Sequence, residues 1–155
     1  MLHSRDQEYA QQVFAQVEPL LKRKRKEQKQ YGSMAHKLPV LIRSAGLAQA
    51  LAFVAATAKR EKDDQDSGKA KWSAQQQLLD DLGQILELKD GAALLSESRT
   101  VQLDEYMFLT QNALAALLWY KRYAQSVLDV ESGEEANDEE DDDVSHRSQQ
   151  EGGEK

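Results

Sequence analysis

Six cationic side chains lie within eight residues in the first quarter of the sequence. They are Lys22, Arg23, Lys24, Arg25, Lys26 and Lys29. Cations at this density can neutralise phosphates and release counterions, which binds nucleic acid without reading its sequence. Two alternatives stay open: the cations could complement the negative end of a helix dipole, or form a nuclear localisation signal. Six cations exceed what a dipole requires, which keeps the phosphate-binding interpretation open.

A second cluster combines aromatic and cationic residues near the end of the last expected helix, at Trp119-Tyr120-Lys121-Arg122-Tyr123. Successive residues on a helix point about 100° apart, so some of these side chains must face solvent. Aromatic rings beside cations suit stacking on nucleobases. The favoured interpretation places Tyr120, and with it Trp119, in the core, with Lys121 and Arg122 beside them.

The residue types that enzymes use for catalysis are sparse. There is no cysteine, which excludes disulfides, thiolate metal ligands and cysteine nucleophiles. The histidines are His3, His36 and His146, which lack the spacing of metal ligands. We expect His36 to be a surface or partly buried helix residue. The carboxylates at 80–81 and 104–105 are sequence neighbours, which point in different directions on a helix. We therefore predict no catalytic residue, no metal site and no cofactor.

Charge is divided unevenly along the chain. Residues 129–155 hold 12 of the 27 acidic residues and two of the 20 basic ones, which leaves 18 basic and 15 acidic residues before them. The net charge of −7 thus combines a body near +3 with a tail near −10. We predict a helical domain at 1–128 and a disordered acidic tail at 129–155, because like charges repel and bury no apolar surface. The tail could keep the free protein soluble, or lie over the basic surface and compete with RNA.

The elements that carry these clusters are expected to be helices, because helix-favouring residues dominate and only two prolines interrupt them. Ser4 with Gln7 forms a capping-box pattern that predicts the first helix start. This helix is expected to bury Tyr9, Val13, Phe14, Val17, Leu20 and Leu21, to kink at Pro19, and to end at Tyr31-Gly32.

Four further segments complete the expected fold. A helix at 34–44, capped by Ser33 and bent at Pro39, is followed by one from Leu47 that buries Phe53 among others and leads into a polar linker at 63–68. Ser73 should cap a helix that extends to Leu88, and Leu94 and Leu95 are expected in a short turn. The last helix is expected to start at Asp104. The sequence predicts an all-α, single compact bundle of five to six helices.

Several segments, in this order and spacing, resemble one family. The first is YGSMAHKLPVLIRSAGL at 31–47, continued by Leu51-Ala52-Phe53. The others are Glu105-Tyr106, Leu109-Thr110 and WYKRYA at 119–124. Together they resemble the small subunit of the type III-B CRISPR effector, the Cmr RNA-silencing complex, over roughly residues 5–127.

The resemblance implies an α-helical subunit that is not the nuclease. In such complexes, copies of the small subunit stack as a minor filament beside the backbone filament that holds the guide RNA, and a large cyclase-like subunit completes the assembly. From the matching segments, the resemblance implicates Lys37 and Arg43, and Lys121 and Arg122, in RNA contact. A structural salt bridge is the alternative for Arg43.

These observations lead to a non-catalytic RNA-binding subunit that acts in antiviral defence. Its expected partners are guide RNA, target RNA, the backbone and large subunits, and stacked copies of itself, with no small-molecule substrate. We expect a soluble protein of the prokaryotic cytoplasm and no membrane association, because no apolar run approaches the roughly 20 residues that cross a bilayer. The alternative is a helical protein-interaction module whose acidic tail binds basic partners without RNA contact.

Overall fold

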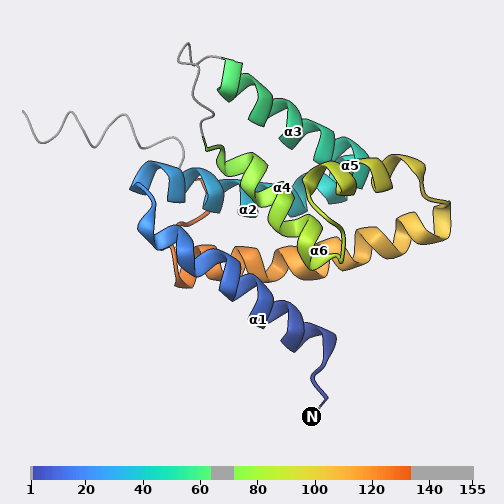
Figure 1. Ribbon diagram of the computed structural model, residues 1–155, viewed down its shortest axis with the longest axis horizontal. Helices are drawn as coiled ribbons and strands as arrows, with labels where there is room; N and C mark the ends of the chain where they lie inside the picture. The colour runs from blue at the N-terminus through green and yellow to red at the C-terminus, as the bar shows by residue number, and fades with distance from the viewer. Residues whose placement is uncertain (1, 64–71, 134–155) are drawn as a thin grey trace, which may run out of the picture.

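The computed structural model describes residues 2–63 and 72–133 (Figure 1). In these ranges the chain forms α1 (Arg5–Val17), the short 3-10 helix η1 (Glu18–Lys22), α2 (Arg25–Ala45), α3 (Leu47–Asp63), α4 (Ala74–Ile85), α5 (Gly91–Thr100) and α6 (Leu103–Ser126). The described part contains no strand, and the predicted all-α fold is confirmed. The predicted linker lies, apart from Asp63, outside the described residues, as does the predicted tail beyond Gly133.

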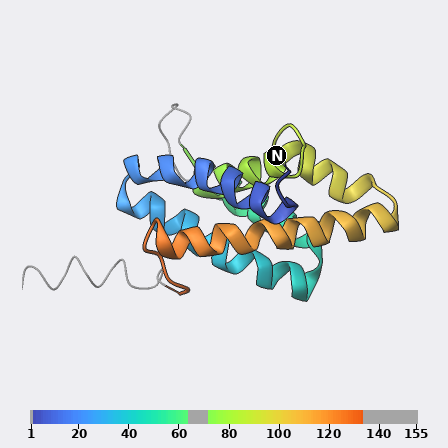
Figure 2. The ribbon, with the colours of Figure 1, turned by 90° about the horizontal axis from the view of Figure 1, so that it is seen from below.

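The longest helix, α6, crosses the molecule, and both α1 and α2 pack along it (Figures 1 and 2). Just beyond the end of α2, at the start of α3, the backbone N–H of Ala48 donates to the hydroxyl of Tyr106 at 3.2 Å. At the start of α2, Arg25 donates to the carbonyl oxygen of Asp129 at 2.7 Å. The two helices are therefore antiparallel, so the first turn of α2 and the last turn of α6 lie at the same end of the bundle. The remaining helices α3, α4 and α5 pack on one another, and α3 and α4 also pack on α2.

One contiguous core joins these helices. Its largest fully buried side chains include Tyr31, Tyr120, Leu38, Leu47, Leu51, Leu78, Leu79, Leu82, Leu94, Leu117 and Leu128. The helical periodicity predicted the burial of Tyr9, Val13, Val17 and Leu20 correctly. The expected burial of Phe14, Leu21 and Phe53 is wrong, because these side chains lie at the edges of their apolar faces and remain largely exposed.

The predicted helix boundaries are wrong around Pro19. This proline lies in η1, and the backbone then extends through Arg23 and Lys24 before α2 begins at Arg25. Helix α2 runs through Tyr31-Gly32, which is therefore no stop, through Ser33, which is no cap, and through Pro39. Burial of every residue from 31 to 36 against neighbouring helices outweighs the low helix propensity of glycine and serine.

Two of the predicted helix starts are correct, whereas two other predicted boundaries are wrong. Ser4 Oγ accepts from Gln7 N at 3.1 Å and Ser73 Oγ from Gln76 N at 3.3 Å, which confirms both predicted caps. The fourth helix ends at Ile85 rather than Leu88. The expected turn at 94–95 is wrong, because Asp90 caps a helix there by accepting from Ala93 N at 2.9 Å.

Packing continues past the predicted domain boundary at residue 128. Val130 is fully buried, and its N–H donates to the Ala124 carbonyl oxygen at 2.8 Å. Within the described residues, no helix is both long and apolar enough to span a membrane.

Candidate nucleic-acid interface

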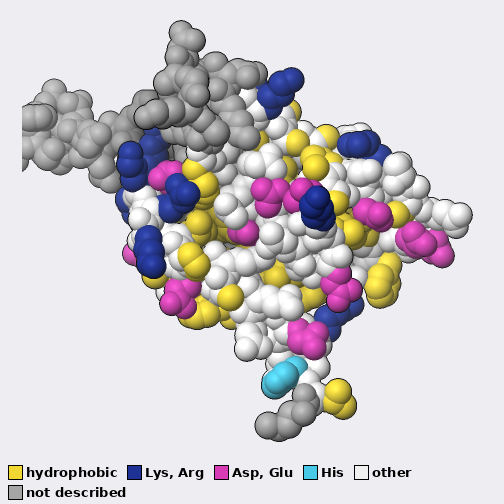
Figure 3. Space-filling model, viewed as in Figure 1, with side chains coloured by type: hydrophobic (Ala, Val, Ile, Leu, Met, Phe, Trp, Pro, Cys, Tyr) yellow, Lys and Arg dark blue, Asp and Glu magenta, His cyan; other side chains and the backbone are white. Residues whose placement is uncertain are grey.

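The cationic run occupies the turn between η1 and α2, at one end of the bundle. Lys22 ends η1, Arg23 and Lys24 form the extended turn, and Arg25 and Lys26 begin α2. All five side chains are exposed, and Figure 3 shows Lys and Arg side chains gathered at this end of the molecule. A helix N-terminus carries a partial positive charge, so cations here are disfavoured by the dipole. The helix-dipole explanation is therefore wrong for Lys24, Arg25 and Lys26, whereas Lys22 lies in the last turn of η1, where it applies.

The two arginines of the run have partners within the fold. The Arg25 guanidinium donates to the carbonyl oxygens of Leu128 and Asp129 and to Gln28 Oε1. It thereby holds the segment that follows α6 against the start of α2. The Arg23 guanidinium pairs with Glu27 at 3.3 Å and lies 4.0 Å from the centre of the Trp72 ring. Arginine suits both arrangements, because its planar fork can donate several bonds and stack on a ring.

The lysines of the run differ from the arginines. Among the described residues, Lys22, Lys24 and Lys26 have no hydrogen-bond or ion-pair partner. All three charges face water, and those of Lys24 and Lys26 do so at the start of α2, where the dipole disfavours them. Lys29 lies on the first turns of α2 and is half-buried. The contacts within the described residues therefore give these three exposed lysines no structural role.

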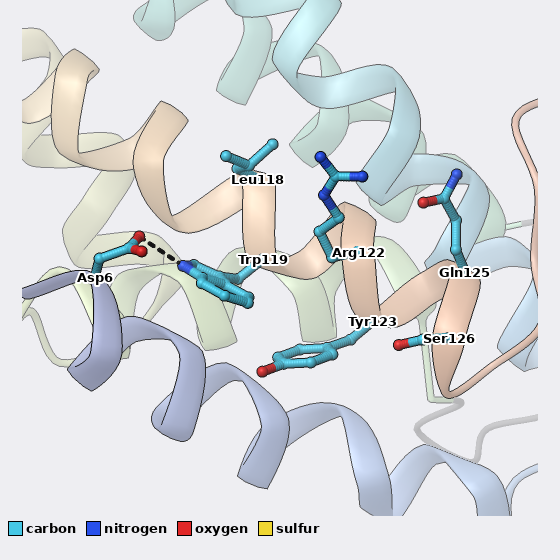
Figure 4. A pocket seen from close by; sticks show the side chains of 7 residues that line it. All are labelled: Asp6, Leu118, Trp119, Arg122, Tyr123, Gln125 and Ser126. Carbon is cyan, nitrogen blue, oxygen red and sulfur yellow. Dashed lines mark hydrogen bonds between the residues drawn. The ribbon is translucent and has the colours of Figure 1, made fainter.

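The antiparallel arrangement brings the second cluster to the same end of the bundle. Lys121 and Arg122 are exposed on the last two turns of α6. Figure 4 shows Arg122 projecting away from α1, whereas Trp119 and Tyr123 project towards it. Trp119 Nε1 donates to Asp6 at 2.9 Å, and the Tyr123 ring meets that of Phe14 edge-on at 5.5 Å.

These contacts show which aromatic side chains of the second cluster pack within the fold. Tyr120 is fully buried, as the core interpretation predicts. Trp119 is half-buried between α1 and α6, beside an open apolar hollow of about 530 Å³ that Leu118 and Arg122 also line (Figure 4). The aromatic side chains of the cluster therefore join helices, and its exposed charges are Lys121 and Arg122.

The remaining two candidates lie further along α2. Arg43 is exposed on the last turn of α2, 18 residues beyond Arg25, which corresponds to about 27 Å along the axis. Lys37 is exposed between them. The structure thus brings the cations of residues 22–29 and 121–122 to one end and leaves Arg43 at the other.

A hydrogen-bonded chain beside the cationic run was not predicted from the sequence. Tyr31 donates to Asp81 at 2.7 Å, Gln77 donates to Asp81 at 2.8 Å, and Gln77 accepts from Trp72 Nε1 at 3.1 Å. Burial raises the pKa of the Asp81 carboxyl to about 6, although the two donated hydrogen bonds oppose this shift. Burial also raises the pKa of Tyr31 well above its usual value. The i,i+4 spacing of Gln77 and Asp81 on α4 is the only sequence signal, and it is common.

His36 lies on α2. The expectation of a surface or partly buried His36 is wrong, because the side chain is buried and its Nε2 lies 2.9 Å from the Val130 carbonyl oxygen. Within residues 2–63 and 72–133, no group of three or more His, Cys, Asp or Glu side chains could hold a metal ion.

The fold and its charged surface define a class: a small all-helical protein with a cationic end. The profile of the CRISPR-associated protein (Cas_Cmr5) family matches residues 5–127, and the chain belongs to this family. The resemblance seen in the sequence is thereby confirmed.

A curated sequence and a crystal structure, both from Thermus thermophilus, show the extent of the similarity. A curated protein named CRISPR system Cmr subunit Cmr5 is 36% identical over 128 residues, which are 83% of this chain and 99% of that protein. The crystal structure of a CRISPR-associated Cmr5 family protein superimposes with a TM-score of 0.67 at 36% identity, and covers 83% of this chain and 100% of the other.

Proposed function

We propose that this chain is the non-catalytic small subunit of a type III-B CRISPR effector, the Cmr complex, in a prokaryotic cytoplasm. Family membership and a relative named as a Cmr subunit support the assignment. In this proposal the chain serves antiviral defence by contacting guide RNA and target RNA through its basic end. The single observation that carries the RNA contact is the set of three exposed lysines, Lys22, Lys24 and Lys26, which lie in and beside the η1–α2 turn and have no partner among the described residues.

The proposed contact is with the RNA backbone and is independent of sequence. Exposed lysines on a turn reach phosphates more readily than base edges, which lie deep in the narrow major groove of an RNA helix. Lys121 and Arg122 extend the surface from α6. Lys37 and Arg43 extend this surface if the RNA runs along α2. If it does not, the RNA contacts only the end of the bundle that carries residues 22–29 and 121–122.

The outer face of α6 supports contact with protein partners. Between Glu105 and Lys121 the helix contains no charged residue. Leu103, Met107, Phe108 and Leu118 are 73%, 55%, 60% and 49% exposed. Exposed apolar side chains gathered on one helix are typical of protein interfaces. We assign this face to neighbouring subunits: stacked copies of this chain in a minor filament, the backbone subunit or the large cyclase-like subunit.

The test of the RNA contact is a pair of matched charge reversals. Lys24→Glu/Lys26→Glu changes the basic end, and Lys89→Glu/Arg99→Glu makes the same charge change at exposed positions beside and on α5. RNA affinity, measured by fluorescence anisotropy, should fall at least about tenfold in the first variant only. The slope of log K against log salt should also decrease by about 0.7 for each lost contact with single-stranded RNA.

Equal losses in the two variants would show that only net charge matters, and would contradict a defined surface. RNA binding that neither variant alters, combined with loss of a protein partner on removal of the acidic tail, supports the alternative function as a protein-interaction module.

A further inference from the structure

A cavity of about 700 Å³ opens beside the cationic run, between the η1–α2 turn and the start of α4. Lys22, Arg23 and Lys24 line it from the turn, and Trp72, Gln77 and Asp81 line it from α4 and the residues before it. Its volume lies within the range of small-ligand sites, which is about 300–1,000 Å³. Glu27, which pairs with Arg23, also lines the cavity. The cavity therefore combines three cations, two carboxyl groups and one aromatic ring in a space that can admit a nucleotide.

The flat surface in this cavity is the pair formed by Arg23 and Trp72. The guanidinium lies 4.0 Å from the ring centre, and the Arg23 side chain remains more than one third exposed. Single-stranded RNA is recognised by stacking of its bases on aromatic rings and on guanidinium planes. Arg23 and Trp72 bring both kinds of group to the cavity, with the guanidinium lying over one face of the ring.

The position of the Trp72 ring is fixed from the core. Its Nε1 donates to Gln77, Gln77 donates to Asp81, and Asp81 accepts from the buried Tyr31. A tryptophan that only covered the start of α4 would need apolar contact alone, as in a hydrophobic staple before an N-cap. The hydrogen-bonded chain instead holds the ring in one orientation, which lowers the entropic cost of stacking a ligand.

We infer that this cavity binds one unpaired nucleobase of RNA, stacked on the Arg23–Trp72 pair, with the adjoining phosphates on Lys22 and Lys24. The inference rests on the proposed RNA contact and adds a base-stacking site to it. Any of the four bases can stack, because each has a flat π face. A base within a duplex cannot enter, so the ligand is a single-stranded or flipped-out nucleotide.

The two tryptophans of the chain allow a direct test. In the full-length Trp119→Phe variant, Trp72 is the sole tryptophan and reports on this cavity. A short oligouridylate should quench its fluorescence with the same midpoint as binding followed by anisotropy. An abasic oligonucleotide of equal length should bind through its phosphates without this quenching.

Each other outcome has a defined meaning. Binding of oligouridylate without quenching, or equal quenching by both oligonucleotides, overturns the base site and leaves the phosphate contact intact. Failure of both oligonucleotides to bind overturns the base site together with the proposed function. In an independent measurement on the otherwise unaltered chain, Trp72→Leu should weaken oligouridylate binding roughly 5- to 150-fold, whereas Trp72→Phe, which keeps a ring, should weaken it less.

Discussion

The guanidinium of Arg25 donates to the carbonyl oxygen of Asp129 at 2.7 Å, across 104 residues of sequence. A residue from the cationic run is thus joined to the first residue of the acidic segment through its backbone and not through its charge. Arg25 also donates to the Leu128 carbonyl oxygen. The contact therefore belongs to the fold, although the sequence placed Arg25 among the RNA-binding candidates.

Arg25→Met should lower the free energy of unfolding by about 1–3 kcal/mol, because two carbonyl oxygens lose a charged donor. Lys24→Met, one residue earlier, should change it by less than about 0.5 kcal/mol, since Lys24 has no partner among the described residues. Urea denaturation followed by circular dichroism measures both. Equal stabilities of the two variants would contradict a structural role for Arg25.

Gly32→Ala should also destabilise the protein, by about 1–3 kcal/mol. A Cβ at position 32 would lie 2.7 Å from the Cβ of Val130, which is closer than such atoms approach. In a Val130→Gly background the obstacle is gone, and Gly32→Ala should instead stabilise helix α2 by up to about 1 kcal/mol. The two backgrounds are compared by thermal and urea denaturation. A destabilising effect of the same size in both would refute the proposed clash.

Stability should fall as the pH rises from about 4 to 6, through the ionisation of Asp81. Its pKa is raised from 3.8 to about 6 by burial, so the folded state binds the proton more tightly than the unfolded state in this range. Relative to Asp81→Asn, the wild type should lose up to about 3 kcal/mol across this window and nothing further above it. Denaturation at a series of pH values gives the difference.

The Tyr31→Phe variant tests whether this pH dependence comes from Asp81, because it removes a hydrogen bond to the Asp81 carboxyl group. Tyr31 donates to the Asp81 carboxylate and lowers its pKa, so its removal should extend the loss of stability to higher pH. A wild type and an Asp81→Asn variant with parallel pH profiles would show that Asp81 does not titrate in this range.

The apolar face of α6 should be needed for assembly and not for folding. Met107→Ser/Phe108→Ser removes two largely exposed side chains, and should leave the midpoint of urea denaturation nearly unchanged. Its co-elution with the other Cmr subunits in size-exclusion chromatography should decrease. Val40→Ser, an exposed apolar position on α2, is the control. Full co-elution of the α6 variant would move the protein interface elsewhere.

The acidic tail should compete with RNA for the basic end. A chain that ends at Gly133 loses ten acidic and two basic residues, and keeps the contacts of Val130. We expect its RNA affinity to be higher than that of the full chain at low salt, with the difference shrinking as salt screens the charges. The control is the 155-residue chain in which every Asp and Glu after Gly133 is replaced by Asn or Gln, which removes the charge and keeps the length. Unchanged affinity at low salt in both would exclude competition.

The all-α fold can be predicted from the sequence, because the helical spacing of apolar residues and the N-cap residues are local signals. Ser4 and Ser73 show this, since each caps a helix through a residue three positions later. Sequence-based prediction fails at Gly32 and Ser33, where residues typical of a helix end lie inside α2. Both residues are buried against other parts of the fold, and Gly32 leaves room for Val130, almost 100 residues away, which no local pattern can show.

The candidate surface was predictable in composition but not in arrangement. The density of cations at 22–29 made this segment a candidate, and the resemblance added Lys37, Arg43, Lys121 and Arg122. The sequence could not separate Arg25, which bonds to the segment after α6, from Lys24 beside it. It also gave no sign that Trp72 stacks on Arg23, since the two residues meet only in the folded chain.

The different roles of arginine and lysine in the cationic run have an evolutionary consequence. Arg23 and Arg25 are tied to Trp72 and to the segment after α6, so substitution there disturbs folding. Lys22, Lys24 and Lys26 can be exchanged with little effect on stability. Under the proposed function, selection can therefore adjust the affinity for RNA one lysine at a time, while the bundle that presents these residues stays the same.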